Sequence, residues 1–233
     1  MVIGGLQKFS LIDFPGKISA IVFTLGCNLR CRYCHNPELV DPASYGESLG
    51  EREVLQFLRS RTGRLQGLVI TGGEPTIHPD LPRFCREVRS LGYKIKLDTN
   101  GTSPEALESL IADGLVDYLA VDIKGPPSAY ARLVGGAVGT EAVPNKIQRS
   151  VAEVLRSRVP HEFRTTYACW LLSEDELRDI AEMVRGCNKL FVQAFAPTKA
   201  LDPTVLGMTP PSRDEMARAV SIFREKGIPA SAR

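Results

Sequence analysis

Strand-like and helix-like hydrophobic patterns alternate along this chain of 233 residues, and this alternation constrains the fold more than any other feature. Each short apolar run is followed by a longer segment whose apolar residues recur at helical spacing. Strands joined by helices pair in parallel, with the helices packed outside the sheet. The sequence therefore predicts an α/β domain of six strand–helix units. The predicted strands are 18–24, 67–71, 93–98, 117–123, 161–167 and 189–195, and the predicted helices are 51–61, 79–91, 104–113, 144–157, 174–185 and 213–226.

Several predicted strands alternate between apolar and polar residues, although a parallel strand that is covered on both faces should be apolar throughout. Lys96 and Asp98 interrupt the third strand, Arg164 the fifth and Gln193 the sixth. Polar side chains on one face of interior strands indicate a polar concavity, as in a partly closed barrel that holds a ligand. An open, doubly wound sheet is the alternative, because periodicity alone does not determine closure.

Composition narrows the classes of protein to consider. The formal net charge is +2 with no basic block, so the sequence predicts neither nucleic-acid binding nor attraction to an anionic membrane. No apolar run reaches the roughly 18 residues that a transmembrane helix needs. We expect one domain over 1–233, with a short N-terminal hairpin (about 1–17) and a Pro-rich loop plus final helix (about 196–233). Segments 126–144 and 196–211 are rich in Gly and Pro, which predicts long functional loops.

Small and polar residues gather where the predicted strands end. The sequences Gly-Gly-Glu-Pro, Asp-Thr-Asn-Gly and Asp-Ile-Lys occupy 72–75, 98–101 and 122–124. Each alone is a common turn, but the carboxyl ends of parallel strands meet at one edge, where α/β proteins build their sites. Paired glycines admit a ligand close to the backbone. The acidic and basic side chains are suited to a charged molecule that contains ribose.

Three cysteines lie in a short loop after the first predicted strand, in Cys27-x-x-x-Cys31-x-x-Cys34. A 4Fe–4S cluster normally has four thiolate ligands, so three closely spaced thiols leave one iron open. Thiols this close together also predict a reducing cytoplasm rather than disulfides. The other cysteines are scattered singly and are expected to be small buried hydrophobic residues. They are Cys85, Cys169 and Cys187.

A structural zinc site is the alternative for the same three cysteines. Zinc sites usually contain two separated Cys pairs that complete a tetrahedral shell, and a second pair is missing here. His35 is an available fourth ligand, but it directly follows Cys34 and is poorly placed to bind the same ion. The zinc alternative would make the chain a binding or scaffold protein.

The cysteine spacing, the aromatic residue before Cys34 and the sequence Gly-Gly-Glu-Pro at 72–75 resemble the radical S-adenosylmethionine (SAM) superfamily. The resemblance covers about residues 6–197. Within it, Ser-Leu-Ile-Asp-Phe-Pro-Gly-Lys at 10–17 and Cys-His-Asn-Pro-Glu-Leu-Val at 34–40 are similar to activating proteins of anaerobic ribonucleoside-triphosphate reductase. It implies a partial (βα)6 TIM-like barrel of the radical SAM type.

The resemblance also implies cofactors and roles. Cys27, Cys31 and Cys34 would ligate three irons of a 4Fe–4S cluster, and the fourth iron would chelate SAM. A single electron would then split SAM into methionine and a 5′-deoxyadenosyl radical. Asp98, Thr99 and Asp122 resemble, more loosely, a monovalent-cation site. Implied contacts with SAM come from Gly72, Gly73 and Glu74 along the methionine, Tyr33, His35 and Asn36 near the adenine, and Asp98, Asp122, Lys124 and Arg164 among the polar groups.

The implied substrate is a glycine of anaerobic ribonucleoside-triphosphate reductase, with a flavodoxin- or ferredoxin-type electron donor. We hypothesise that the reductase docks on segments 125–143 and 196–211. Alternatives within the superfamily are activases of other glycyl-radical enzymes and 7-carboxy-7-deazaguanine synthases, which share the cysteine spacing. The sequence His-Asn-Pro at 35–37 favours the activases.

Overall fold

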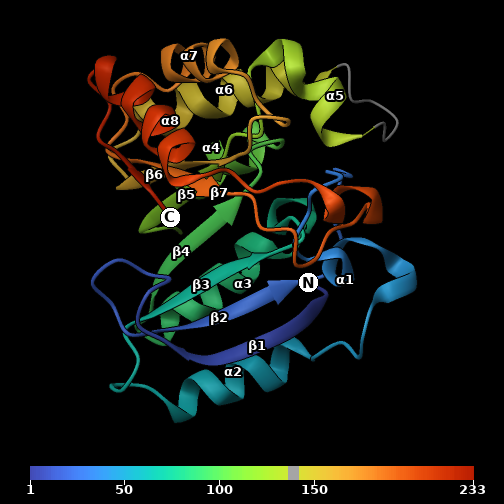
Figure 1. The fold of residues 1–233 in the computed structure, drawn as a ribbon. Helices are drawn as coiled ribbons and strands as arrows, with labels where there is room; N and C mark the ends of the chain where they lie inside the picture. Colours follow the sequence, from blue (N-terminus) through green and yellow to red (C-terminus); the bar gives the residue numbers. More distant parts are fainter. Residues whose placement is uncertain (136–141) are drawn as a thin grey trace. The chain divides into compact units, whose positions relative to one another are not determined.

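The computed structural model describes residues 1–135 and 142–233 (Figure 1). The chain forms two compact units. The chain passes between the two units at both ends of 29–37, at both ends of 100–104 and within strand β5 (Tyr118–Asp122). The first unit consists of Met1–Asn28, Glu38–Thr99 and Glu105–Leu119, and the second of Leu29–Pro37, Asn100–Pro104 and the described part of Ala120–Arg233.

The first unit contains four strands that pair in chain order. Strand β1 (Ile3–Ser10) is antiparallel to β2 (Ser19–Thr24), whereas β3 (Gly67–Gly72) and β4 (Lys94–Thr99) continue the sheet in parallel. Strand β1 falls in the segment predicted as an N-terminal hairpin (about 1–17), but it is not among the six predicted strands because two adjacent glycines weaken its hydrophobic pattern. The carboxyl ends of β2, β3 and β4 therefore lie at one edge of this sheet.

Helices α2 (Glu51–Ser60) and α3 (Leu81–Ser90) pack against each other, and α3 contacts β4. Cys85 belongs to the buried face of α3 and is 1% exposed, as predicted. Helices α1 (Pro37–Val40) and α4 (Pro104–Ala112) also belong mainly to this unit.

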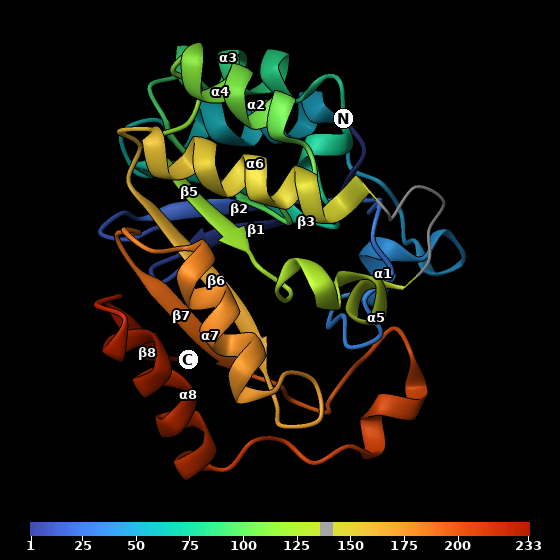
Figure 2. The same cartoon turned by 90° about the horizontal axis from the view of Figure 1, so that it is seen from above.

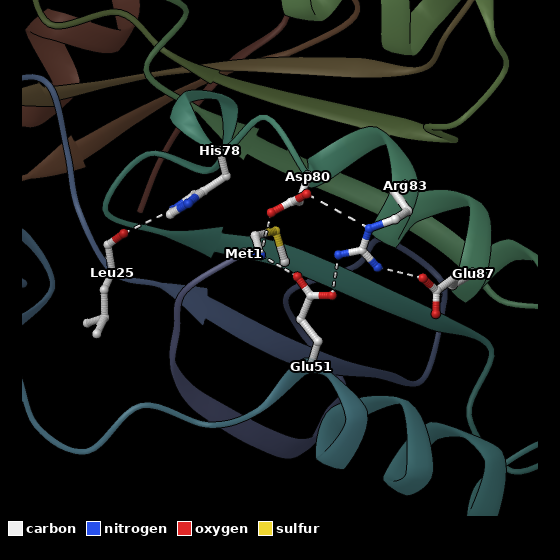
Figure 3. A network of polar contacts seen from close by, with 7 residues as sticks. All are labelled: Met1, Leu25, Glu51, His78, Asp80, Arg83 and Glu87. Carbon is white, nitrogen blue, oxygen red and sulfur yellow. Dashed lines mark hydrogen bonds and ion pairs between the residues drawn. The ribbon is translucent and has the colours of Figure 1, made fainter.

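A polar network joins the N-terminus to these helices (Figure 3). The amino group of Met1 donates a hydrogen bond to Glu51, and Arg83 donates to the other oxygen of Glu51 at 2.6 Å. Nearby, a ring nitrogen of His78 lies 3.0 Å from the carbonyl oxygen of Leu25, two residues before Cys27. The network holds the segment after β2 against the start of α3.

The second unit contains the parallel strands β6 (His161–Tyr167), β7 (Leu190–Ala194) and β8 (Ala230–Ala232), again in chain order. Helices α7 (Glu174–Met183) and α8 (Arg213–Glu225) lie side by side, and α8 packs against β7 and β8 (Figure 2). Both begin with a capping box, in which a serine and the glutamate three residues later satisfy each other's backbone N–H groups. The described part of this unit also contains helices α5 (Tyr130–Val134) and α6 (Val143–Arg156).

Every predicted strand and helix is present, with ends that differ by two residues at most. Two expectations are wrong. The segment 126–144, predicted as a loop, contains α5 and the start of α6, while its residues 136–141 lie outside the described residues. Cys169 is exposed rather than buried, because it lies in the loop after β6 rather than on an apolar helix face.

Among the described residues, no helix is both long enough and apolar enough to cross a membrane.

Candidate functional site

In the first unit, the Gly-Gly-Glu-Pro turn lies against the backbone that follows β2. The N–H of Gly73 donates to the carbonyl of Thr24 at 2.9 Å, and the N–H of Glu74 donates to that of Gly26 at 2.8 Å. A Cβ atom on Gly73 would lie 1.9 Å from the oxygen of Gly26, and Gly72 has a positive φ of 125°. Both positions therefore require glycine. The turn fixes the backbone immediately before Cys27.

Glu74 connects this turn to the end of β4. Its Oε1 accepts hydrogen bonds from the N–H and hydroxyl of Thr76 at 3.1 and 2.5 Å, and from the hydroxyl of Thr99 at 2.6 Å. Glu74 has no exposed surface. A buried carboxylate needs such donors, because a charge without partners is very costly in the interior. Glu74 therefore holds the turn after β3 to the end of β4.

Asp98, at the end of β4, is ion-paired within the same strand. Lys96 donates to its carboxylate at 2.6 Å, and the Lys96 side chain is only 3% exposed. The ammonium group also lies 5.9 Å from the ring centre of Tyr118. This pair explains the polar alternation of β4 that the sequence showed.

The cysteine loop begins in the first unit and continues in the second. Cys27 and Cys34 are half-buried and Cys31 is buried, and none of the three forms a disulfide within the described part of the chain. The N–H of Cys34 donates to the carbonyl of Cys31 at 3.0 Å, which makes a tight turn. Across residues 1–135 and 142–233, no three His, Cys, Asp or Glu side chains are arranged around a single metal ion. As a donor set, three thiols in a loop fit a 4Fe–4S cluster, which distributes its ligands over several irons.

In the second unit, Asp122 lies between two cations. Lys124 donates to one of its oxygens at 3.0 Å and Arg164 to the other at 2.8 Å. Burial alone raises the pKa of the Asp122 carboxyl, but the charges of Arg164 and Lys124 outweigh burial and hold this pKa well below its usual range. The backbone N–H of Lys124 also donates to the Tyr130 hydroxyl at 3.2 Å.

Tyr33, directly before Cys34, is 4% exposed, and within the described part of the chain its hydroxyl has no hydrogen-bond partner. Burial raises its pKa well above the usual value, and the charge of Cys31 adds to this shift. Burial would lower the pKa of Lys124, yet Asp122 outweighs it and the net shift is upward. The second unit therefore presents an ammonium group and a protonated phenol close to Cys31.

His35 and Asn36 continue the loop and are exposed. The His35 ring lies 6.0 Å from that of Phe195, after β7. Partial burial lowers the pKa of His35, and the charge of Lys124 lowers it further. The imidazole is therefore mainly neutral at pH 7.

Three contributors were missed by sequence reasoning. Tyr130 falls in a segment predicted as a loop, and the partnership of Thr76 with Glu74 gives no sequence signal. Glu162 is 1% exposed and lies 4.0 Å from Arg164 and 3.7 Å from Arg233. The sequence did carry a signal for Glu162, because this residue occupies one of the alternating polar positions of β6. A separate cavity of about 550 Å³, bordered by α8 and β8, contains none of the predicted site residues.

Comparison with known proteins gives a consistent result. The model of the Radical SAM superfamily matches residues 21–185. A Methanocaldococcus jannaschii protein, provisionally named a glycyl-radical enzyme activating enzyme, is 33% identical over 96% of this chain and 92% of its own length. The pyruvate formate-lyase-activating enzyme of Clostridium pasteurianum is 32% identical over 53% of this chain and 54% of its own. A 7-carboxy-7-deazaguanine synthase of Methanothermobacter thermautotrophicus is 35% identical over 47% and 42% respectively.

Among solved structures, Streptococcus suis SuiB bound to its precursor peptide SuiA superposes with a TM-score of 0.69 at 13% identity. It covers 91% of this chain, which spans about half of SuiB, 48% of its length. SuiB bound to S-adenosylmethionine gives a TM-score of 0.65. The likeness confirms the predicted fold class, α/β with mostly parallel strands of the partial TIM-like barrel type.

Proposed function

Because this chain belongs to the radical SAM superfamily, we propose that it activates a glycyl-radical enzyme, and specifically anaerobic ribonucleoside-triphosphate reductase. The superfamily establishes that it is an enzyme that uses a 4Fe–4S cluster and SAM, so the zinc-scaffold alternative is set aside. The observation that carries the activase assignment is the end-to-end match, 96% of this chain, to a relative named as an activating enzyme. The choice of reductase rests on the similarity at 10–17 and 34–40.

We propose that Cys27, Cys31 and Cys34 hold the cluster and leave one iron for SAM. When bound, the cluster supplies the electron that cleaves SAM to methionine and a 5′-deoxyadenosyl radical, which takes a hydrogen atom from the substrate. The protein's part is to position SAM. We propose that the methionine lies along Gly72, Gly73 and Glu74. The close backbone contact of Gly73 with Gly26 and the hydrogen bonds of Glu74 with Thr76 and Thr99 keep this turn rigid.

In the second unit we assign adenine recognition to Tyr33, His35 and Asn36. The buried Tyr33 hydroxyl supports this, because a protonated phenol without a partner can donate to a ring nitrogen of the ligand. Lys124 and Arg164 are held by Asp122 and supply positive charge for polar groups of SAM. Asp98 stays a proposed SAM contact, and a monovalent-cation site at Asp98, Thr99 and Asp122 stays a prediction.

Segment 196–211 supports docking of a protein substrate. It carries two exposed apolar side chains, Leu206 at 40% and Met208 at 37%. Leu206→Asp combined with Met208→Asp should impair activation of the reductase while SAM cleavage without the reductase continues, because both side chains are exposed. Full activation by this double variant would exclude these two side chains from the docking surface. The electron donor is proposed to be a flavodoxin or a ferredoxin in the cytoplasm.

The test is anaerobic reconstitution followed by EPR with a candidate reductase. A brown protein with about four irons per chain and a doublet from a glycyl radical on the reductase is the expected result. Cys27→Ala, Cys31→Ala and Cys34→Ala should each abolish both colour and SAM cleavage, whereas Cys85→Ala should retain them. SAM cleavage without a radical on any glycyl-radical enzyme would favour a small-molecule substrate, as in 7-carboxy-7-deazaguanine synthase.

A further inference from the structure

Within the second unit, the cysteine loop is tied to segment 196–211 through Arg32, which lies between Cys31 and Cys34. The N–H of Asp202 donates to the backbone carbonyl of Arg32 at 3.0 Å. The Arg32 guanidinium donates through Nε to Asp202 Oδ2 at 2.6 Å and through Nη2 to the Thr204 hydroxyl at 3.0 Å. Main chain and side chain of one loop residue are therefore held by the same partner segment.

Asp202 also organises its own segment. It precedes the 3₁₀ helix η5 (Pro203–Gly207), and its Oδ1 accepts hydrogen bonds from the N–H and hydroxyl of Thr204 at 2.9 and 2.6 Å. Hydrogen bonds from Thr204, followed by that from Arg32, lower the pKa of Asp202 to about 2. The carboxylate thus stays charged at any physiological pH. One oxygen accepts hydrogen bonds from Thr204 in η5, and the other accepts one from Arg32.

An isolated ion pair on a protein surface stabilises little, because water screens it and two long side chains lose freedom. Arg32 is 57% exposed, so its charge alone would not fix the loop. Three hydrogen bonds together restrict Arg32: one at its backbone carbonyl and two from its guanidinium, to Asp202 and Thr204. On the other side of the same loop, the N–H of Arg30 donates to the carbonyl of Val134 at 2.8 Å. Residues 30–32 are thereby anchored on both sides.

We propose that Arg32, Asp202 and Thr204 form a latch that positions the loop carrying Cys31 and Cys34, and that a protein substrate docking on segment 196–211 acts on the cluster through this latch. The second half of the proposal rests on the proposed function, because it needs a protein substrate. Leu206 and Met208 lie two and four residues beyond Thr204 and are exposed. A protein that binds these two side chains would therefore contact η5 or the residue that follows it. Arg32 and Asp202 are positioning residues and do not contact the reacting atoms.

The test uses the reconstituted holoenzyme and the charge reversals Arg32→Asp and Asp202→Arg, alone and combined. The readouts are the rate of iron loss to a ferrous chelator and the EPR spectrum of the reduced cluster, both measured without the substrate protein. Each single reversal should accelerate iron loss by about tenfold, the lower range for loss of an outer partner at a metal site. The combined variant should lose iron no faster than the faster of the two single variants, because both substitutions break the same contact. Should a reversal fail to fold, Asp202→Asn and Thr204→Val test the same contacts by removing one partner each.

The matched control is the pair Arg178 and Asp175 on α7, another surface ion pair, with a distance of 2.7 Å. Its reversals should leave iron loss and the EPR spectrum unchanged. Single latch variants that lose iron at the original rate, or a combined variant in which the two effects add, would overturn the latch. For the coupling, adding the substrate protein should change the EPR spectrum of the unmodified enzyme and not that of Asp202→Arg; an equal change in both overturns it. Absence of a cluster in the unmodified enzyme would refute the proposed function separately.

Discussion

Gly73 and Gly26 meet backbone to backbone, and a Cβ atom on Gly73 would lie 1.9 Å from the carbonyl oxygen of Gly26. The contact places the turn after β3 directly against the residue before Cys27. The turn after β3 and the segment after β2 are therefore in direct backbone contact. No side chain can give way here, because the obstructing atom belongs to the main chain.

Gly73→Ala should lower the free energy of unfolding by at least about 2 kcal/mol, because overpacking against backbone forces the main chain to shift. The measurement is urea denaturation followed by circular dichroism. Gly46→Ala is the control, since no atom of the described residues lies within 4 Å of the place that a Cβ atom on Gly46 would take. Equal midpoints for the two variants would contradict the close approach of Gly73 to Gly26.

Glu74→Gln should cost about 1–3 kcal/mol of stability, because the buried acceptor of three hydrogen bonds loses its charge. The Thr99 hydroxyl donates to the same carboxylate, so the stability losses of Thr99→Val and Glu74→Gln should not be additive. The double variant, measured by urea unfolding, tests this coupling. Glu47→Gln, at an exposed residue, should change stability by less than about 0.5 kcal/mol. Additive effects of the Glu74 and Thr99 substitutions would argue against a shared network.

The alternating hydrophobic pattern was sufficient to predict the strands and helices that are long enough to show a period. Strand β7, with one polar residue in an otherwise apolar run, was found to within one residue at each end. Helix α5 was missed because five residues are too few to establish helical spacing, and prolines precede it. Strand β1 lies in the segment predicted only as an N-terminal hairpin, because its glycines and polar residues mask the alternation that would mark a strand.

For the candidate site, the sequence identified residues at strand ends but not their partners. The partnership of Glu74 with Thr99 spans 25 residues and depends on β3 and β4 being neighbours. The latch contact of Arg32 with Asp202 spans 170 residues and has no local signal. Residue type and spacing predict chemistry, whereas the contacts that hold those residues come from tertiary packing.

Thiol labelling should separate the three cysteines outside the loop. Burial raises the pKa of Cys85 to about 12 and that of Cys187 to about 11, so at pH 8 both remain protonated and inaccessible. Cys169 is exposed. Iodoacetamide should therefore modify Cys169 first in the folded holoenzyme, as measured by peptide mass spectrometry, and Cys169→Ser should abolish this early product. Labelling of Cys85 at a comparable rate would contradict the buried face of α3.

Acidification should destabilise the protein through its histidines before its carboxylates respond. Burial lowers the pKa of all three, His35, His78 and His161, below the ordinary value of 6.5. The unfolded chain then binds protons more readily than the native state, so this stability is fully present above about pH 6.5 and falls at lower pH. Carboxylates whose pKa is lowered, such as Glu51, lose their contribution only below about pH 4.

The expected result is a urea midpoint that decreases between pH 7.5 and 5.5, with a smaller decrease in His78→Gln. This variant retains a side chain that can donate to the carbonyl of Leu25, which His78 contacts at 3.0 Å, but it cannot titrate in this range. The control Glu47→Gln, which leaves all three histidines in place, should keep the pH dependence of the unsubstituted protein. A midpoint that stays constant in the unsubstituted protein would contradict the lowered histidine pKa values, since histidine is the side chain that ordinarily changes charge in this window.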